Sequence, residues 1–452
     1  MSTTQIVQAS SAESILAAAA AADAGLLGSP GRRVLVLSRG GPIPETATSP
    51  AELPGMAPAL ARFDQIESLD DLIRPEDARA WSPRGTDRTV FERLLRSGWS
   101  LGDDVELVLE RDVHQPTEWL ASTFYGAPLI LLSAGLSAYA PPPEPFSWGV
   151  EHRVVRLVHV DRVPGLAPWP FDHTEPDIAA VPDDAWTRVL TETARAAGLM
   201  DNPPRPATAL VVSENLAGRG LLDRAVETRL LAETIDAVAA DGARNVVVLA
   251  DPGGPVNLRG RLTGVAARDD LSVELIEPAA PHDAYLVALA PQVVGGCFGP
   301  LLASAVRAGV RTASTGAKLV KENFRPYPHP DRIVHTIVDA LCREDAAWAD
   351  SDDLARLVEC VVFCVYPERF KERRESVVQT VKSLSDADLG RYPTRRRAEA
   401  LGLIEAPPPP PPTPDPVPAP APTRQTPLGR ISAGIRKAAR RNPTGPRAGS
   451  TS

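Results

Sequence analysis

The sequence is poor in cysteine and has fewer basic than acidic side chains. Only 4 of the 452 residues are Cys, and 48 Lys and Arg stand against 57 Asp and Glu, which gives a formal net charge of −9. Proteins that bind nucleic acid normally present a basic face, so this balance argues against a nucleic-acid partner. Cys342, Cys360 and Cys364 lie in apolar stretches that are predicted to be helical. Buried reduced thiols are typical of the cytoplasm, and we expect core packing here and no metal site.

The sequence also lacks a long apolar run. No stretch reaches the roughly 18 uncharged apolar residues that a membrane-spanning helix needs. The run 15–22 resembles the core of a signal peptide, but Glu13 precedes it, Asp23 follows it, and no Lys or Arg lies upstream. We therefore expect the first helix of a βα unit, which follows a strand at 5–8 and is capped by Ser10 or Ser11.

Short β-branched runs alternate with helical stretches along most of the chain. The pattern predicts an α/β protein with two Rossmann-like domains that face each other across a cleft, one over 1–200 and one over 207–400, joined by the proline-rich segment 203–206. In the first domain we expect strands at 32–37, 105–109, 128–132 and 153–160, and a helix at 117–125. In the second we expect strands at 209–213, 245–249, 272–276, 293–294 and 310–313, and a helix at 221–240.

Parallel sheets bind ligands at the carboxyl ends of their strands. The loops after Leu132, Leu249 and Val294 are therefore the places where a site is expected. They lie in the segments 131–141, 246–252 and 293–300.

Several stretches of the chain resemble one known family. They are VVGGCF at 293–298, FRPY at 324–327, RIVHTIVDAL at 332–341 and GLSAYAP at 135–141. The chain resembles the bacterial alpha-2,8-polysialyltransferase family over most of residues 1–400. The resemblance implies a glycosyltransferase B arrangement, an acceptor-side first domain and a nucleotide-sugar-side second domain. It also implies CMP-sialic acid or another sugar nucleotide as ligand, a glycan as partner, and no required cofactor.

The residues that would carry the family's chemistry are replaced. The resemblance implies a carboxylate base before Gly135, a His in a His-Pro motif and a pair of phosphate-binding hydroxyls. At these places the sequence has Ala134, Asp251 and the pair Gly299-Pro300. Losing one general acid or base lowers a rate by roughly 10² to 10⁴. We expect inverting sialyl transfer to be impaired and a binding or regulatory role to persist. An active glycosyltransferase with another sugar nucleotide and other catalytic residues stays open.

Other residues, in these segments and elsewhere in the chain, are candidate ligand contacts. Lys318 and Lys321 follow Ser314-Thr315-Gly316, and they either replace a lost cation or form a solvated helix face. Glu144, Glu214 and Asp251 are alternative bases, whereas His329-Pro330, although a literal His-Pro pair, is interpreted as a surface turn. The full set of predicted contacts is Ser133, Gly135, Ser213, Glu214, Pro252, Gly253, Gly295, Gly296, Cys297, Phe298, Ser314, Thr315, Lys318 and Lys321.

The C-terminal segment 405–452 differs in composition from the rest. An unbroken proline run at 407–412 and the alternating prolines after it predict a disordered tail. We interpret the tail's partner as an anionic membrane surface at the inner membrane face, an anionic glycan or an acidic protein. A third hypothesis, that the chain is an interaction protein organised by its tail, stays open. A purely solubilising tail is the alternative. The basic residues are Arg424, Arg430, Arg436, Lys437, Arg440, Arg441 and Arg447.

Overall fold

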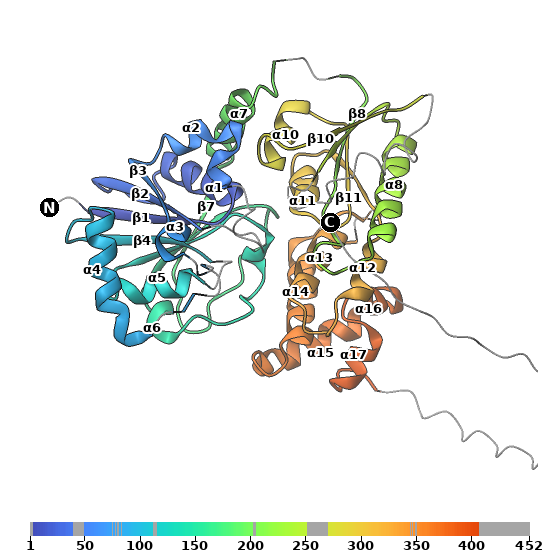
Figure 1. The fold of residues 1–452 in the computed structure, drawn as a ribbon. Coiled ribbons are helices and arrows are strands. Elements are labelled where there is room, and N and C mark those ends of the chain that lie inside the picture. The colour runs from blue at the N-terminus through green and yellow to red at the C-terminus, as the bar shows by residue number, and fades with distance from the viewer. Residues whose placement is uncertain are drawn as a thin grey trace, which may run out of the picture. The chain divides into compact units, whose positions relative to one another are not determined.

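A computed structural model describes the fold of most of the chain (Figure 1). The described residues fall within one compact unit, Met1–Ala406. The expectations for the tail, apart from residue 405, therefore lie outside the described part of the chain. The structure describes residues 3–38, 49–74, 76, 78, 81–82, 84–111, 115–201, 205–250, 270–343, 345, 347–348 and 350–405.

The first half of the chain forms a seven-stranded parallel sheet of order β3-β2-β1-β4-β5-β6-β7. The chain order reverses between β1 and β4, as in doubly wound sheets. Its strands are β1 (Thr4–Ala9), β2 (Arg32–Leu37), β3 (Gln65–Ser68), β4 (Val105–Glu110), β5 (Leu129–Ser133), β6 (Val154–Val160) and β7 (Asp177–Val181). Its helices are α1 (Ala12–Asp23), α2 (Ala57–Leu60), α3 (Leu69–Ile73), α4 (Arg88–Gly98), α5 (Thr117–Thr123), α6 (Trp148–Glu151) and α7 (Asp183–Ala196).

The second half forms a five-stranded parallel sheet of order β10-β9-β8-β11-β12. Here the order reverses between β8 and β11, which pair in register from Val293 opposite Ala209 to Gly295 opposite Val211. The strands are β8 (Thr208–Val212), β9 (Asn245–Leu249), β10 (Ser272–Ile276), β11 (Val293–Gly296) and β12 (Arg311–Ser314). The helices are α8 (Arg224–Ala240), α10 (His282–Leu289), α11 (Pro300–Arg307), α12 (Ala317–Asn323), α13 (Asp331–Leu341), α14 (Ser351–Val365), α15 (Arg374–Ser383), α16 (Asp386–Arg391) and α17 (Arg395–Ala400).

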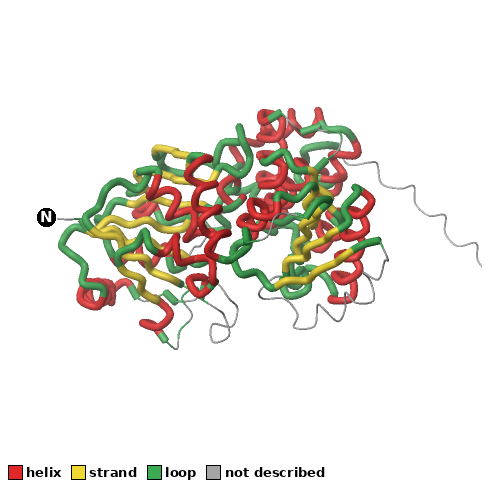
Figure 2. Tube along the Cα trace, turned by 90° about the horizontal axis from the view of Figure 1, so that it is seen from above, coloured by secondary structure: helices red, strands yellow, loops and turns green. Residues whose placement is uncertain are grey.

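These two sheets confirm the α/β class with two Rossmann-like sheets. Figure 2 shows the strands of each sheet side by side with helices flanking them. Each predicted strand is present within one or two residues. The edge strands β3 and β7 were not predicted. The sequence of β3, QIES, is largely polar, and β7, DIAAV, has only a short apolar run that is mostly exposed.

Local sequence explains where α1 and α14 begin. Ser11 caps α1: its hydroxyl accepts the N–H of Ser14, and the Ser14 hydroxyl accepts the N–H of Ser11. The Asp350 carboxylate accepts the N–H groups of Asp352 and Asp353 at the start of α14. Side-chain acceptors of this kind satisfy N–H groups that have no partner within a helix. The capping prediction for Ser11 is confirmed.

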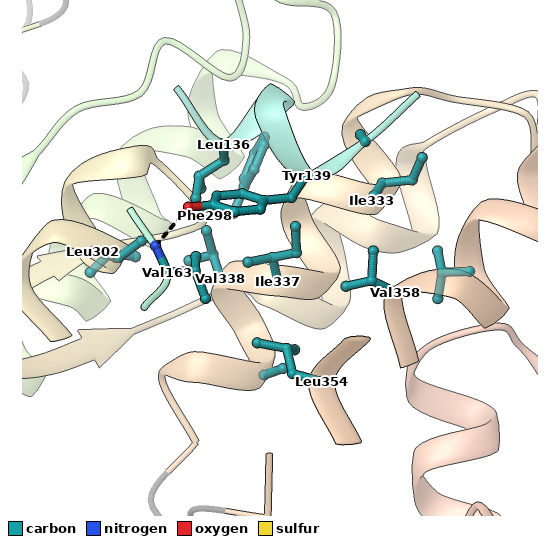
Figure 3. Packing of buried hydrophobic residues seen from close by; sticks show 14 of the residues in the cluster. Leu136, Tyr139, Val163, Phe298, Leu302, Ile333, Ile337, Val338, Leu354 and Val358 are labelled. Atoms are coloured by element: carbon teal, nitrogen blue, oxygen red, sulfur yellow. Dashed lines mark hydrogen bonds between the residues drawn. The ribbon is translucent and has the colours of Figure 1, made fainter. Parts of the chain in front are cut away.

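One apolar cluster joins the loop after β5 to the helices that follow the second sheet (Figure 3). Leu136 and Tyr139 belong to a short 3-10 turn, Leu136–Tyr139, and share this cluster with Phe298. Ile333 and Ile337 of α13 contribute to it, as do the thiols of Cys360 and Cys364 on α14. Core packing is therefore confirmed for the two cysteines of α14.

Candidate functional site

The carboxyl ends of β8 and β11 meet where the strand order of the second sheet reverses, the usual ligand position in such folds. The side chain of Glu214, two residues after β8, reaches the loop that follows β11. Its Oε1 atom accepts the backbone N–H groups of Cys297 at 2.7 Å, Phe298 at 3.0 Å and Gly299 at 3.0 Å. Its Oε2 atom accepts the N–H of Phe298 at 3.1 Å. A carboxylate of the chain itself is thus bound by the backbone N–H groups of residues 297–299, which we call the amide group.

Two glycines permit this close approach. A Cβ atom on Gly296 would lie 3.0 Å from Oε1 of Glu214, and one on Gly299 would lie 3.2 Å from it. Gly299 also precedes α11, which begins with Pro300 and has no side-chain cap. Because a helix N-terminus carries partial positive charge, the Glu214 carboxylate stabilises this end of α11. The second and third glycines of GGCFG, Gly296 and Gly299, are therefore explained by an internal anion.

The electrostatic setting of Glu214 combines opposing effects. Burial of the carboxyl group is the largest effect and raises its pKa above the ordinary value, although the three N–H donors and the nearby Arg219 oppose this shift. Arg219 lies over the Phe298 ring at 5.1 Å and pairs with Asp331. A carboxylate with both oxygens engaged by backbone donors is not placed to accept a proton from a substrate. As an alternative base, Glu214 is disfavoured by this geometry.

The hydroxyl groups after β12 hold the two loops together. The Ser314 hydroxyl donates to the carbonyl of Cys297 at 3.0 Å, and the Thr315 N–H donates to the carbonyl of Gly296 at 3.0 Å. The Thr315 hydroxyl is hydrogen-bonded to that of Thr234 on α8. These groups are engaged with the protein itself and support the loop that carries the amide group.

Three further predicted contacts at this edge are buried. A Cβ atom on Gly295 would lie 2.8 Å from Cγ2 of Thr234, so this glycine is needed where β11 packs on α8. Cys297 and Ser213 are each 4% exposed. Burial also raises the pKa of the Cys297 thiol, so it stays protonated and unreactive.

In the first half, the position of the expected base lies in the loop after β5. Ser133 is buried, Ala134 follows it, and Gly135 opens the 3-10 turn. The Ala134 carbonyl accepts a hydrogen bond from Nε of Arg162 at 3.0 Å. Arg162 also donates to Asp283 at 2.7 Å and to the Ser304 hydroxyl of α11. Its buried guanidinium thus links the loop after β5 to α10 and α11.

The remaining predicted residues have different outcomes. Asp251, Pro252 and Gly253 lie outside the described residues. Lys318 is exposed on α12, as a solvated helix face predicts, but the same interpretation is wrong for Lys321, which is 6% exposed. A seven-residue helix that lies against α13 and α16 buries one of its two lysines, and the sequence of α12 alone does not show those neighbours.

His329 belongs to the turn before α13. It stacks on Phe324 with ring centroids 4.9 Å apart, and its Nδ1 accepts the N–H of Asp331 at 3.3 Å. Burial lowers its pKa. These contacts give His329 a structural role in the turn.

A cavity of about 1080 Å³ opens beside α12 and is lined by α13, α16 and α17. Arg391 of α16 and Arg396 and Arg397 of α17 lie on its wall. Sequence reasoning missed these residues, although the basic run at 395–397 was a visible signal. The place of this basic run beside α12 and α13 depends on tertiary packing, which the sequence pattern does not reveal.

Two searches of the described residues gave negative results. No group of three or more His, Cys, Asp or Glu side chains in this part of the chain is placed to hold a metal ion. None of the described helices combines the length and apolar character needed to cross a membrane.

No protein-family model matches the sequence, and no curated protein matches it. Solved structures are similar to it at low identity. MurG of Acinetobacter baumannii is 12% identical, with 70% of this chain and 78% of that chain covered and a TM-score of 0.37. Phytolacca americana UGT2, complexed with UDP-2fluoro-glucose and pterostilbene, is 12% identical over 89% and 99%, with a TM-score of 0.40. The UDP-GlcNAc 2-epimerase of Neisseria meningitidis, bound to UDP-GlcNAc, is 11% identical over 89% and 100%, with a TM-score of 0.42.

Proposed function

We propose that this chain is a glycosyltransferase-like protein, of glycosyltransferase B arrangement, that has lost sialyl transfer and retains weak binding of a sugar nucleotide or an anionic glycan. The observation that carries the proposal is the occupation of the amide group by Glu214. Backbone N–H groups at a helix N-terminus are a common binding site for phosphate. Here a nucleotide phosphate reaches them only when the Glu214 carboxylate leaves.

The loop after β5 supports the loss of transfer. Ala134 has no group that accepts a proton, and its carbonyl is held by Arg162. The pair Gly299-Pro300 supplies no hydroxyl, and Pro300 supplies no N–H. At these two positions the chain therefore offers neither a base for an acceptor hydroxyl nor a side-chain donor for a leaving phosphate, the two main contributions to inverting transfer.

The test compares the wild-type protein with Glu214→Ala by calorimetry with CMP, CMP-sialic acid and UDP-GlcNAc. We expect weak binding of at least one of these to the wild type and no product. Removal of the internal carboxylate frees three N–H groups and is expected to raise nucleotide affinity roughly tenfold or more. Glu233→Ala, an exposed acid on α8, is the matched control and leaves affinity unchanged.

Two results would overturn the proposal. Hydrolysis or transfer of either sugar nucleotide by the wild type, abolished by Glu214→Gln, would show an active enzyme with a new catalytic residue. Absence of binding by both the wild type and a folded Glu214→Ala variant would show that no nucleotide site persists. Circular dichroism of each variant separates loss of folding from loss of binding.

A further inference from the structure

The cavity beside α12 carries an excess of positive charge. Eight Lys and Arg line it against three Asp and Glu. Its volume of about 1080 Å³ is that of a site for a small molecule such as a metabolite. The basic residues are Lys318, Lys321, Arg325, Arg332, Arg343, Arg391, Arg396 and Arg397, and the acidic ones are Glu322, Asp339 and Asp388.

Two of the three acids are already neutralised by arginines. Asp339 receives two hydrogen bonds from Arg391, at 2.6 and 2.7 Å, in the paired geometry that suits guanidinium and carboxylate. Asp388 is paired with Arg343. The third acid, Glu322 of α12, is exposed to solvent. Apart from these two pairs, six cations and one exposed acid remain on the wall.

Lys321 is the least satisfied of these cations. Its side chain lines the cavity, is 6% exposed, and its Nζ atom has no hydrogen-bond partner among the described residues. Nζ lies 5.4 Å from the ring centre of Tyr392. A buried ammonium group without a hydrogen-bond acceptor is strongly unfavourable. An anion that pairs with it removes this cost, which makes the free energy of binding more favourable.

Charged groups on α13 and α16 surround Lys321. Burial, with smaller contributions from Arg332 and Arg391, lowers its pKa to about 7, against the opposing effect of Asp339. His335 also faces it; burial lowers the pKa of this imidazole to about 4, and its Nε2 lies 2.8 Å from the Ala317 carbonyl. Near neutral pH, Lys321 is therefore poised to take up a proton when an anion arrives.

Two arginines on the wall are held in place by the fold. Arg332 donates to the carbonyl of Phe324 at 2.9 Å and lies over the Tyr327 ring at 4.1 Å. Arg397 donates to the carbonyl of Cys364 at 2.9 Å through Nε and lies over the same ring at 4.9 Å. Guanidinium groups that are already ordered lose little freedom when they bind an anion.

We propose that this cavity binds a small molecule that carries an oxyanion, phosphoryl or carboxylate, and that Nζ of Lys321 is its deepest contact. The site is separate from the amide group, since Glu214 and residues 297–299 do not line it. It does not depend on the function proposed above, because neither the amide group nor any transfer step is involved.

The test uses two sugars that differ in the anion on the same carbon. Glucose 6-sulfate presents a tetrahedral oxyanion and glucuronic acid a planar carboxylate, and neither titrates near neutral pH. Calorimetry on the full chain is expected to show binding of at least one of them and none of glucose. Stronger binding of the sulfate assigns a phosphoryl ligand, and stronger binding of the uronate assigns a carboxylate ligand.

Variants and proton uptake decide the role of Lys321. Lys321→Met and Arg396→Met are expected to weaken binding, the first roughly tenfold or more. Lys382→Met, an exposed lysine of α15 outside the cavity wall, is the matched control. Near pH 7.5 the wild-type binding enthalpy is expected to vary with the ionisation enthalpy of the buffer, because Lys321 takes up a proton, and Lys321→Met is expected to lose this dependence.

Two results would overturn the proposal. One is that neither anionic sugar binds more tightly than glucose to the folded wild-type protein. The other is that Lys321→Met and Arg396→Met both bind as the wild type does. Glu214→Ala serves as a cross-check: it changes nucleotide affinity at the amide group and leaves binding of the two sugars unchanged.

Discussion

Arg162 and Asp283 form an ion pair at 2.7 Å in which the side chains are 1% and 4% exposed. Arg162 follows β6 of the first sheet, and Asp283 lies in α10 beside the second. The guanidinium also donates to the Ala134 carbonyl and lies over the Trp186 ring at 5.2 Å. Burial of a charge is tolerated when it is paired and hydrogen-bonded, as it is here.

We predict that Asp283→Asn destabilises the protein strongly. It removes the carboxylate that is hydrogen-bonded to the buried guanidinium of Arg162 and leaves Glu13 as the remaining acid that acts on it. Removing one partner of a buried pair typically lowers the free energy of unfolding by about 3–5 kcal/mol. Urea denaturation measures this. The exposed pair Arg188–Asp184 gives the control, since Asp184→Asn is expected to change stability by less than about 1 kcal/mol. Equal effects of the two substitutions would contradict a buried, paired role for Arg162.

Gly316, at the start of α12, is predicted to tolerate no side chain. Its φ is +69°, a left-handed conformation that favours glycine, and an added Cβ would overlap the side chain of Leu230. Gly316→Ala is expected to lower the free energy of unfolding by about 1–3 kcal/mol. Gly98→Ala, at the end of α4 with no atom near an added Cβ, is the matched control. Thermal melts that rank Gly98→Ala as the more damaging change would disprove this assignment.

The lowered pKa of Lys321 predicts a pH dependence of stability. The pKa is about 7 in the folded protein and about 10.4 in an unfolded chain, so between these values the unfolded state binds more protons. Lys321 therefore makes the protein more stable as the pH rises from about 7, by up to about 1.4 kcal/mol per pH unit. The measurement is the difference in unfolding free energy between the wild type and Lys321→Met at several pH values. That difference should shift in favour of the wild type as the pH rises, and a flat difference would contradict the lowered pKa.

The four thiols are predicted to be unreactive in the folded protein. Burial raises the pKa of Cys297 and raises that of Cys342 to about 11, and a hydrogen bond with Cys364 together with burial raises the pKa of Cys360. Thiolate is the reactive form, so a disulfide reagent near neutral pH should modify them slowly, with the half-buried Cys342 first. Denaturant is expected to expose all four. Rapid modification of Cys360 or Cys364 in the native state would place α14 outside the core.

The apolar, β-branched runs predicted most of the fold because buried parallel strands leave a clear sequence pattern. Of the four edge strands, β10 and β12 were predicted, whereas the largely polar β3 and the short β7 were missed. Helices α15 to α17 were missed for a different reason. Their sequences are short and charged, and contact with α13 and α14 positions them.

The candidate site was predicted in location and only partly in chemistry. Gly296, Cys297 and Phe298 do lie at the carboxyl edge of the second sheet, as expected from the glycines after β11. The carboxylate that fills this place comes from Glu214, more than eighty residues earlier in the chain. Such a pairing depends on the neighbouring positions of β8 and β11, which a sequence pattern does not reveal. The burial of Lys321 depends in the same way on α13 and α16.

The Glu214 carboxylate can be regarded as a ligand that the chain carries with it. A tethered group is present at a local concentration that dilution does not lower, on the order of millimolar or more for short connections. Any free anion must compete with that concentration before it reaches the backbone N–H groups of residues 297–299. The ratio of the nucleotide dissociation constants of the wild type and Glu214→Ala would therefore measure how strongly the chain competes for its own amides.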